Sequence, residues 1–198
     1  MDALTSQKWD RAAGRYDLFS AGAEKRWAEA KQKFFAPMRG NVLFLAIGTG
    51  LDFQFFPPGQ DIVALDISPE MIERARPRAA AYKGRIELRL LDVHELDAEE
   101  AFDQVFTACT FCSVPDPVNG LRRLHRALKP GGELRMFEHT GSRWFPFSMM
   151  LHLMTPISRL SGPELNRPTV ANVAKAGFTV REVDNLYLDI VKTITAVK

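Results

Sequence analysis

An apolar run over residues 42–47 stops at Gly48-Thr49-Gly50, and this junction constrains the fold more than any other stretch of the chain. Glycine adopts positive φ and has no Cβ, so a strand that ends in this way can turn tightly and bring bare N–H groups close to a ligand. A second apolar run, over residues 62–65, ends in Asp66, which lies 16 positions after Gly50. That separation is close to the roughly 20 residues at which a strand-end acid meets a ribose in dinucleotide folds. The two runs together predict a nucleoside-binding site.

Strand and helix patterns alternate after this junction, which predicts parallel strands joined by crossover helices. The expected parallel strands cover residues 42–47, 62–65, 86–90, 103–108 and 133–138. Two further strands, residues 178–183 and 188–197, are expected to form a hairpin joined around Asp184-Asn185. The fold class is therefore α/β, with a Rossmann-like, seven-stranded, mostly parallel sheet that ends in a C-terminal antiparallel hairpin.

The helical patterns are less regular than those of the strands. Ser68 and Pro69 predict a helix that reaches about Tyr82, and further helices are expected to include residues 121–128 and 169–176. Within the N-terminal residues 1–41, we expect a short helix and a turn, followed by an amphipathic helix that Ser20 caps. Its apolar face, which includes Trp27, suits packing on the sheet or contact with a membrane surface.

Residues 143–168 interrupt the alternating pattern. The stretch is apolar and rich in methionine, and prolines divide it, so we interpret it as broken helices that form a small cap. It is too short and too often interrupted to cross a membrane, which takes roughly 20 apolar residues. A length of 198 residues with 46% apolar side chains fits one domain over residues 1–198 that includes this cap insertion.

Charge and cysteine content narrow the possible partners. The formal charge is +3 over residues 1–41, −4 over 42–141 and +3 over 142–198. The basic flanks suit an anionic membrane surface or substrate, although a solvated helix face carries as much charge, and no basic cluster indicates nucleic acid.

Two cysteines, Cys109 and Cys112, make neither a disulfide framework nor a metal site, and we expect Cys109 to be buried in a strand. With no basic and apolar leader, a cytoplasmic protein is expected, at most peripheral at the inner membrane face.

Several motifs follow one another along the chain: Gly48-x-Gly50, Asp66, Asp92, the strand at Asp103-Gln104-Val105 and the turn Lys129-Pro130-Gly131-Gly132. In this order and spacing they resemble the class I S-adenosylmethionine-dependent methyltransferases. Other segments are similar to bacterial phospholipid N-methyltransferases and to membrane-associated thiol methyltransferases: residues 53–59, 112–114, 137–139 and 165–167. The resemblance covers nearly the whole chain and implies S-adenosylmethionine as cofactor.

The resemblance also implies roles for individual residues. The cofactor-binding positions would be Tyr16, Ala46, Gly48, Gly50, Asp66, Ile67, Asp92 and Val93, where Asp66 meets the ribose, Asp92 the adenine amino group and Tyr16 closes over the cofactor. The substrate would lie against Phe111, Cys112, Ser113, Glu138 and Arg167, where the Arg167 guanidinium could bind a lipid phosphate or make a structural salt bridge. Tyr16 and His139 are the candidate catalytic residues, because an amine acceptor must lose a proton to become a nucleophile.

The most diagnostic segment departs from the family pattern. Phe44 stands where relatives have an acid that orients the methionine amino group, and Ala46 stands where they have their first glycine. Asp52 could supply the missing carboxylate, or it could be an acid that favours the start of a helix. The expected reaction is methylation of a phospholipid amine, most plausibly phosphatidylethanolamine. A thiol or quinone methyltransferase and a non-catalytic cofactor-binding module are the alternatives.

Overall fold

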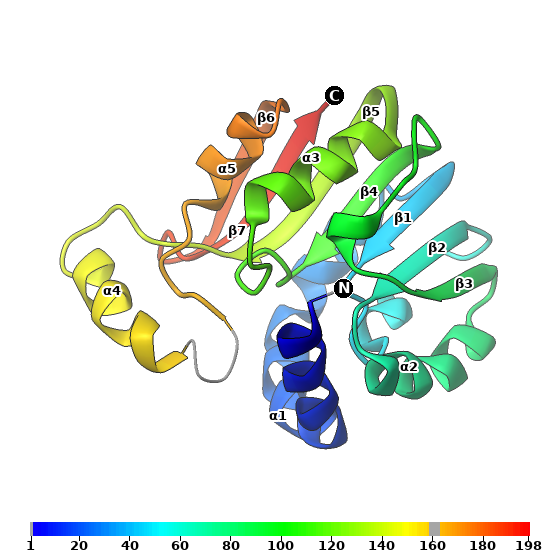
Figure 1. Ribbon diagram of the computed structural model, residues 1–198, viewed down its shortest axis with the longest axis horizontal. Helices are drawn as coiled ribbons and strands as arrows, with labels where there is room; N and C mark the ends of the chain where they lie inside the picture. The colour runs from blue at the N-terminus through cyan, green and yellow to red at the C-terminus, as the bar shows by residue number, and fades with distance from the viewer. Residues whose placement is uncertain (1, 159–162) are drawn as a thin grey trace.

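The computed structural model describes residues 2–158 and 163–198, and in it a central sheet separates two layers of helices (Figure 1). The strands are β1 (Asn41–Leu45), β2 (Asp61–Asp66), β3 (Arg85–Leu90), β4 (Phe102–Ala108), β5 (Leu128–His139), β6 (Thr179–Tyr187) and β7 (Val191–Val197). They lie in the order β3-β2-β1-β4-β5-β7-β6. The first five pair in parallel, whereas β7 is antiparallel to both of its neighbours, β5 and β6. The expected mostly parallel sheet with a terminal hairpin is confirmed.

The turn of the hairpin is not where the sequence placed it. Asp184 and Asn185 lie within β6 and pair with β7, and the chain reverses at Leu188 and Asp189. Both turn residues have positive φ, 44° and 57°. Aspartate tolerates positive φ, whereas leucine adopts it only at an energetic cost. Turn propensity therefore favoured Asp184-Asn185 over the position that contains Leu188.

The N-terminal segment is one helix, α1 (Ala3–Phe35), and the expected turn before Ser20 is wrong. Asp2 caps it, because its Oδ1 accepts hydrogen bonds from the N–H groups of Leu4 (3.0 Å) and Thr5 (3.3 Å). Gly14 lies inside the helix, where a glycine costs only about 1 kcal/mol. Packing of α1 against α2 and the cluster around Phe35 offsets that cost.

One helix layer contains α1, the short 3₁₀ helix η1 (Leu51–Phe55) and α2 (Pro69–Ala81), and the other contains α3 (Pro117–Ala127) and α5 (Thr169–Lys175) (Figure 1). Ser68 caps α2 as expected, since its hydroxyl accepts the N–H of Met71 at 3.1 Å. Under α1, the aromatic rings of Phe35, Phe44 and Phe56 pack together, with the Phe44 centroid 5.7 Å from Phe35 and 5.1 Å from Phe56. Phe44 is fully buried, so its side chain belongs to the core.

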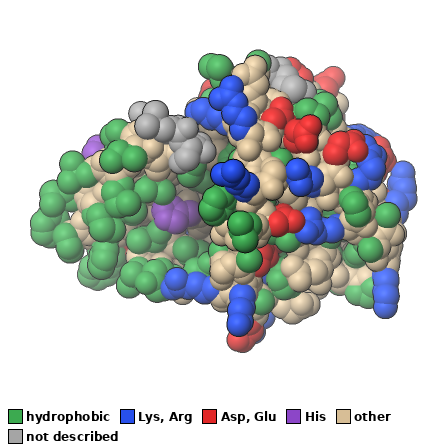
Figure 2. All heavy atoms as spheres, turned by 90° about the horizontal axis from the view of Figure 1, so that it is seen from below, with side chains coloured by type: hydrophobic (Ala, Val, Ile, Leu, Met, Phe, Trp, Pro, Cys, Tyr) green, Lys and Arg blue, Asp and Glu red, His purple; other side chains and the backbone are tan. Residues whose placement is uncertain are grey.

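The cap contains one helix in the part of the chain described, α4 (Phe147–Ser158), rather than several broken ones, and Pro156 lies inside it. Arg159 and Leu160, which the sequence assigned to the same cap, lie outside the described residues. The helix projects from the body of the molecule, and Figure 2 shows hydrophobic side chains gathered on that side. Leu153 and Ile157 are 70% and 73% exposed. No helix within the described ranges is both long and apolar enough to span a bilayer.

Candidate functional site

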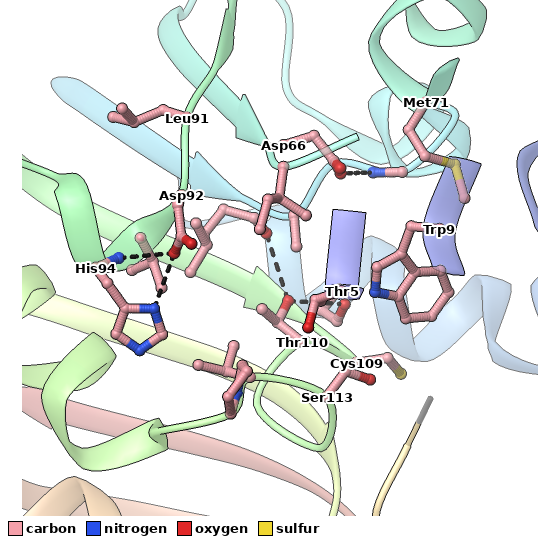
Figure 3. A pocket seen from close by; sticks show the side chains of 18 of the residues that line it. Thr5, Trp9, Asp66, Met71, Leu91, Asp92, His94, Cys109, Thr110 and Ser113 are labelled. Atoms are coloured by element: carbon pink, nitrogen blue, oxygen red, sulfur yellow. Dashed lines mark hydrogen bonds and ion pairs between the residues drawn. The ribbon is translucent and has the colours of Figure 1, made fainter. Parts of the chain in front are cut away.

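One cavity lies at the carboxyl edge of the parallel strands β1 to β4, where open α/β sheets bind their ligands (Figure 3). Successive strand ends and the start of α1 line it with Ala46 and Gly48, Asp66 and Ile67, Leu91, Asp92 and Val93, Cys109, Thr110 and Ser113, and Thr5, Trp9 and Tyr16. In Figure 3 Asp92 and His94 lie at one end of this cavity and Trp9 at the other. It is named the cofactor cavity below, because it contains most of the residues that the family resemblance assigns to the cofactor. Trp9 and Thr5 come from the part of α1 that the sequence did not mark as functional.

Asp66 ties the β2 edge to the glycine loop. Its Oδ2 accepts the N–H of Gly48 at 2.8 Å and its Oδ1 accepts the N–H of Ser68 at 2.9 Å. The residue is 5% exposed, and burial raises the pKa of this carboxyl to about 6 although these N–H groups oppose the rise. Each carboxylate oxygen keeps a second lone pair, so Asp66 can also accept hydrogen bonds from the hydroxyl groups of a ligand.

Asp92 sits at the end of β3 and caps η2 (Val93–Glu95). Its Oδ1 accepts the N–H of His94 at 3.0 Å and lies 2.8 Å from that ring's Nδ1, while Oδ2 accepts the N–H of Asp2 at 2.8 Å. Partial burial works against ionisation, but these contacts hold the pKa of Asp92 below its usual range. The start of α1 is thereby fixed to the carboxylate at the end of the cavity.

The loop after β1 contains residues with positive φ, a backbone conformation that glycine adopts most readily. Ala46, Gly48 and Gly50 all have positive φ, at 56°, 55° and 79°. An L-residue in this region costs about 1–2 kcal/mol, so Ala46 is strained at a position where the family resemblance predicts a glycine. Gly50 itself does not line the cavity; a Cβ there would lie 2.8 Å from the Phe53 ring, so its lack of a side chain permits the turn into η1.

Tyr16 from α1 stands between the cofactor cavity and a second one. Its ring lies over Gly48, where an added Cβ would be 3.6 Å from the Tyr16 Cε1 atom. Both cavities share Tyr16, Ala46, Ala108 and Cys109 as walls, which places them side by side. Burial is the largest cause that raises the pKa of Tyr16, and the nearby Cys109 and Asp52 raise it further. The phenol therefore keeps its proton at neutral pH. Tyr16 is therefore suited to donate a hydrogen bond and not to act as a base there.

The second cavity has apolar walls and a small number of ionisable groups. Trp27 and Phe137 form part of the wall and pack edge to face at 6.0 Å, so Trp27 faces the protein and not a membrane. His139 enters the cavity from the end of β5, and its Nδ1 is buried with no hydrogen-bond partner among the described residues. Because burial lowers the pKa of His139, the ring is neutral at pH 7 and can accept a proton.

Lys31 and Asp52 lie at another part of the second cavity. Lys31 Nζ is 2.6 Å from Asp52 Oδ1 and 2.5 Å from Glu24 Oε1. Burial alone would lower the pKa of Lys31, but the two carboxylates raise it, and the ammonium stays charged. Asp52 is thus part of a buried ionic cluster with two residues of α1.

Glu138 is fully buried and holds the loop that follows β4. Its carboxylate accepts hydrogen bonds from Thr107 Oγ1 (2.9 Å) and from the N–H groups of Thr110 (3.1 Å) and Phe111 (3.2 Å). Burial raises its pKa to about 7 against these contacts. The loop it holds contains Cys109 and Thr110, which line the cofactor cavity.

The structure brings the expected substrate residues together only in part. Ser113 lines the cofactor cavity, whereas Phe111, Cys112, Glu138 and Arg167 line neither of the two cavities. Arg167 Nε lies 2.7 Å from Glu164 Oε2, which is the salt-bridge alternative for this residue. The expectation of a buried Cys109 in a strand is wrong, because Cys109 follows β4 with φ of 52° and opens onto both cavities. The sequence offered one signal for this position: Cys109 comes directly after the apolar strand predicted over residues 103–108.

The cofactor cavity fits a nucleoside. Leu91, Val93 and Met71 give apolar walls for a base, and the carboxylates of Asp66 and Asp92 can accept hydrogen bonds from hydroxyl or amino groups. Within the part of the chain that the structure describes, no group of His, Cys, Asp and Glu side chains could hold a metal ion.

Comparison with known proteins gives matches to methyltransferases. A family described as a methyltransferase domain matches residues 42–132. The ubiquinone/menaquinone biosynthesis C-methyltransferase UbiE of Geotalea daltonii is 31% identical over 159 residues, which cover 74% of this chain and 67% of that protein. The thiol S-methyltransferase TMT1B of Homo sapiens is 28% identical over 141 residues, covering 65% of this chain and 57% of that protein.

Solved structures show the same fold. A Thermotoga maritima protein described as an S-adenosylmethionine-dependent methyltransferase, possible histamine N-methyltransferase, superposes with a TM-score of 0.74 at 17% identity, covering 98% of this chain and 99% of that one. At this identity the likeness concerns the fold alone. The chain spans 57% to 67% of the length of the UbiE and TMT1B relatives described above.

Proposed function

Because this chain belongs to the class I S-adenosylmethionine-dependent methyltransferases, we propose that it methylates a small apolar acceptor that carries an ionisable X–H group, namely a thiol or a reduced quinone. The observation that carries the proposal is the second cavity, which adjoins the cofactor cavity and combines apolar walls with the neutral His139. The UbiE and TMT1B relatives, which are named for quinone and thiol methylation, support the same acceptor classes.

The bound cofactor supplies an electrophilic methyl group on a sulfonium that carries its own leaving group. Asp66 and Asp92 hold the nucleoside, and Tyr16 covers the Gly48 loop between the two cavities. The acceptor loses one proton as it gains the methyl group, and His139, whose Nδ1 has no hydrogen-bond partner among the described residues, is the group that we assign to accept it. Apolar wall residues such as Trp27 and Phe137 suit an apolar acceptor, and holding that acceptor in line with the methyl group is most of what methyl transfer requires of a protein.

A phospholipid amine acceptor has less support in the site. Its phosphate would need a cationic partner, but Arg167 pairs with Glu164 outside both cavities. Among the described residues that line the second cavity, Lys31 is the one Lys or Arg, and two carboxylates already engage it. Phosphatidylethanolamine therefore remains as the alternative that the assay below tests.

Transfer of labelled methyl from S-adenosylmethionine to three acceptors tests this proposal: an alkyl thiol, a reduced quinone, and phosphatidylethanolamine in vesicles. We expect label on the thiol or the quinone. Label on phosphatidylethanolamine alone would refute the proposed acceptor class, and cofactor binding with no turnover on any acceptor would favour a non-catalytic module. His139→Gln should lower kcat by about 10²- to 10⁴-fold and leave cofactor affinity unchanged, because His139 lies outside the cofactor cavity.

We further propose that α4 rests on an anionic membrane surface and brings apolar acceptors to the enzyme. The helix has no Asp, Glu, Lys or Arg, its one titratable side chain is His152, and its exposed side chains include Met149, Leu153 and Ile157. Arg143 is exposed just before it, and residues 142–198 carry a formal charge of +3. An exposed apolar helix beside excess positive charge is typical of interfacial binding.

Vesicle flotation tests this part of the proposal. Leu153→Asp should reduce binding to vesicles that contain anionic lipid, whereas Val183→Asp, at an exposed apolar position on β6, should not. Equal flotation of both variants and the parent protein would show that α4 does not contact the membrane.

A further inference from the structure

Lys31, Glu24 and Asp52 form a buried ionic cluster in the second cavity. Lys31 is 7% exposed and donates to Glu24 Oε1 at 2.5 Å and to Asp52 Oδ1 at 2.6 Å. The other oxygen of Glu24, Oε2, is buried and has no hydrogen-bond partner among the described residues. A buried carboxylate oxygen without a donor is costly, and a ligand donor would relieve that cost.

The charges of the cluster suit a zwitterion. Two carboxylates and one ammonium give it a formal charge of −1, so it attracts a cationic group. The ammonium of Lys31 has three N–H donors, of which the two carboxylates use two. The cluster can therefore accept from a ligand ammonium at Glu24 and donate to a ligand carboxylate at Lys31.

The position of the cluster connects it to the cofactor. Glu24, Lys31 and Asp52 line a cavity that shares Tyr16 and Ala46 as walls with the cofactor cavity, so the cluster lies in the cavity next to the one that would hold the nucleoside. The position at which the family resemblance predicts an acid for the amino group is Phe44, which is 0% exposed and packed among aromatic rings. No carboxylate can act from that position.

We propose that Lys31, Glu24 and Asp52 form the subsite for the amino-acid end of the cofactor, with Glu24 Oε2 accepting its ammonium and Lys31 donating to its carboxylate. The α1 helix thus supplies the function that Phe44 cannot. This inference rests on the proposed function, because it requires that the chain bind S-adenosylmethionine. A primary ammonium on an acceptor would suit the same groups, and the experiment separates the two sources.

Calorimetry with two ligands tests the subsite without turnover. S-adenosylhomocysteine carries the amino-acid end, whereas 5′-methylthioadenosine has the same nucleoside and sulfur without it. Glu24→Gln should weaken binding of S-adenosylhomocysteine by about tenfold or more and leave binding of methylthioadenosine unchanged. The matched control is Glu29→Gln on the same helix, whose side chain is 84% exposed and pairs with Lys33, and it should change neither affinity.

Each other outcome overturns the assignment. If Glu24→Gln leaves both affinities unchanged, or raises only the KM of an amine acceptor, the cluster does not bind the amino-acid end. If both ligands weaken equally, Glu24 does not distinguish a ligand that carries the amino-acid end from one that lacks it, and the assignment fails. If the parent protein binds neither ligand, the proposed function itself fails, which is a different result from loss of discrimination in the variant.

Discussion

Glu138 should make the stability of this protein depend on pH in an unusual direction. Its carboxyl is fully buried, with a pKa of about 7 against an ordinary value of 4.5. The folded state therefore binds a proton more tightly than the unfolded state does. For this group, stability is greatest below pH 4.5 and is lost as pH rises through 7. At about 1.4 kcal/mol per pKa unit, the loss amounts to about 3 kcal/mol.

The test is Glu138→Gln, which keeps the shape and one acceptor oxygen but cannot ionise. Urea unfolding between about pH 5 and pH 8 should show that the parent protein loses stability relative to the variant as pH rises. The buried Asp66, whose pKa is also raised, changes the stability of both proteins with pH in the same way. The difference in stability between the parent protein and the variant therefore reports on Glu138 alone. Glu182→Gln, at an exposed position on β6, is the matched control and should leave the pH profile unchanged.

A second substitution gives the structural contribution of the same group. Glu138→Ala removes the acceptor for the N–H groups of Thr110 and Phe111 and leaves both buried, at about 1–3 kcal/mol each, so we expect a loss of about 4 kcal/mol. Cofactor affinity should fall with it, because Thr110 lines the cofactor cavity. Parallel pH profiles for the parent protein and Glu138→Gln would refute the reasoning, since they would mean that Glu138 is ionised in the fold throughout.

Three further substitutions test other parts of the site. Ala46→Gly should raise the free energy of unfolding by about 0.5–1 kcal/mol, since relief of positive-φ strain exceeds the added entropy of the unfolded chain; unchanged or lower stability in thermal unfolding would contradict this. Phe44→Glu should destabilise the protein by several kcal/mol in urea titration, because it places a charge in the aromatic core, whereas Phe44→Leu should cost less than about half as much. Asp66→Asn should weaken S-adenosylhomocysteine binding in calorimetry; parent affinity should fall as pH drops through about 6, where the carboxylate is protonated, and the variant should lack that dependence. Equal pH dependence in both would exclude the ribose role.

Local patterns were sufficient to predict much of the fold. Apolar runs that end in Gly48 and Asp66 predicted adjacent strand ends, and the observed Gly48 to Asp66 hydrogen bond joins those two ends. Ser68 followed by Pro69 predicted the start of α2 because capping is decided within one turn of helix. By contrast, the single helix α1 depends on packing against distant elements, so local breaking signals at Gly14 and Ser20 were misleading.

The candidate site was predictable where one residue acts at a strand end and not where side chains from distant segments meet. The sequence by itself determined the parallel sheet, the glycine loop and the carboxylates at the ends of β2 and β3, because each follows from spacing along the chain. Only the tertiary structure decided that Phe44 belongs to the core, that Glu138 holds a loop, and that Glu24 and Lys31 meet Asp52. The physical reason is that burial and ion pairing depend on which distant residues pack together, and α1 must be docked on the sheet before those contacts exist.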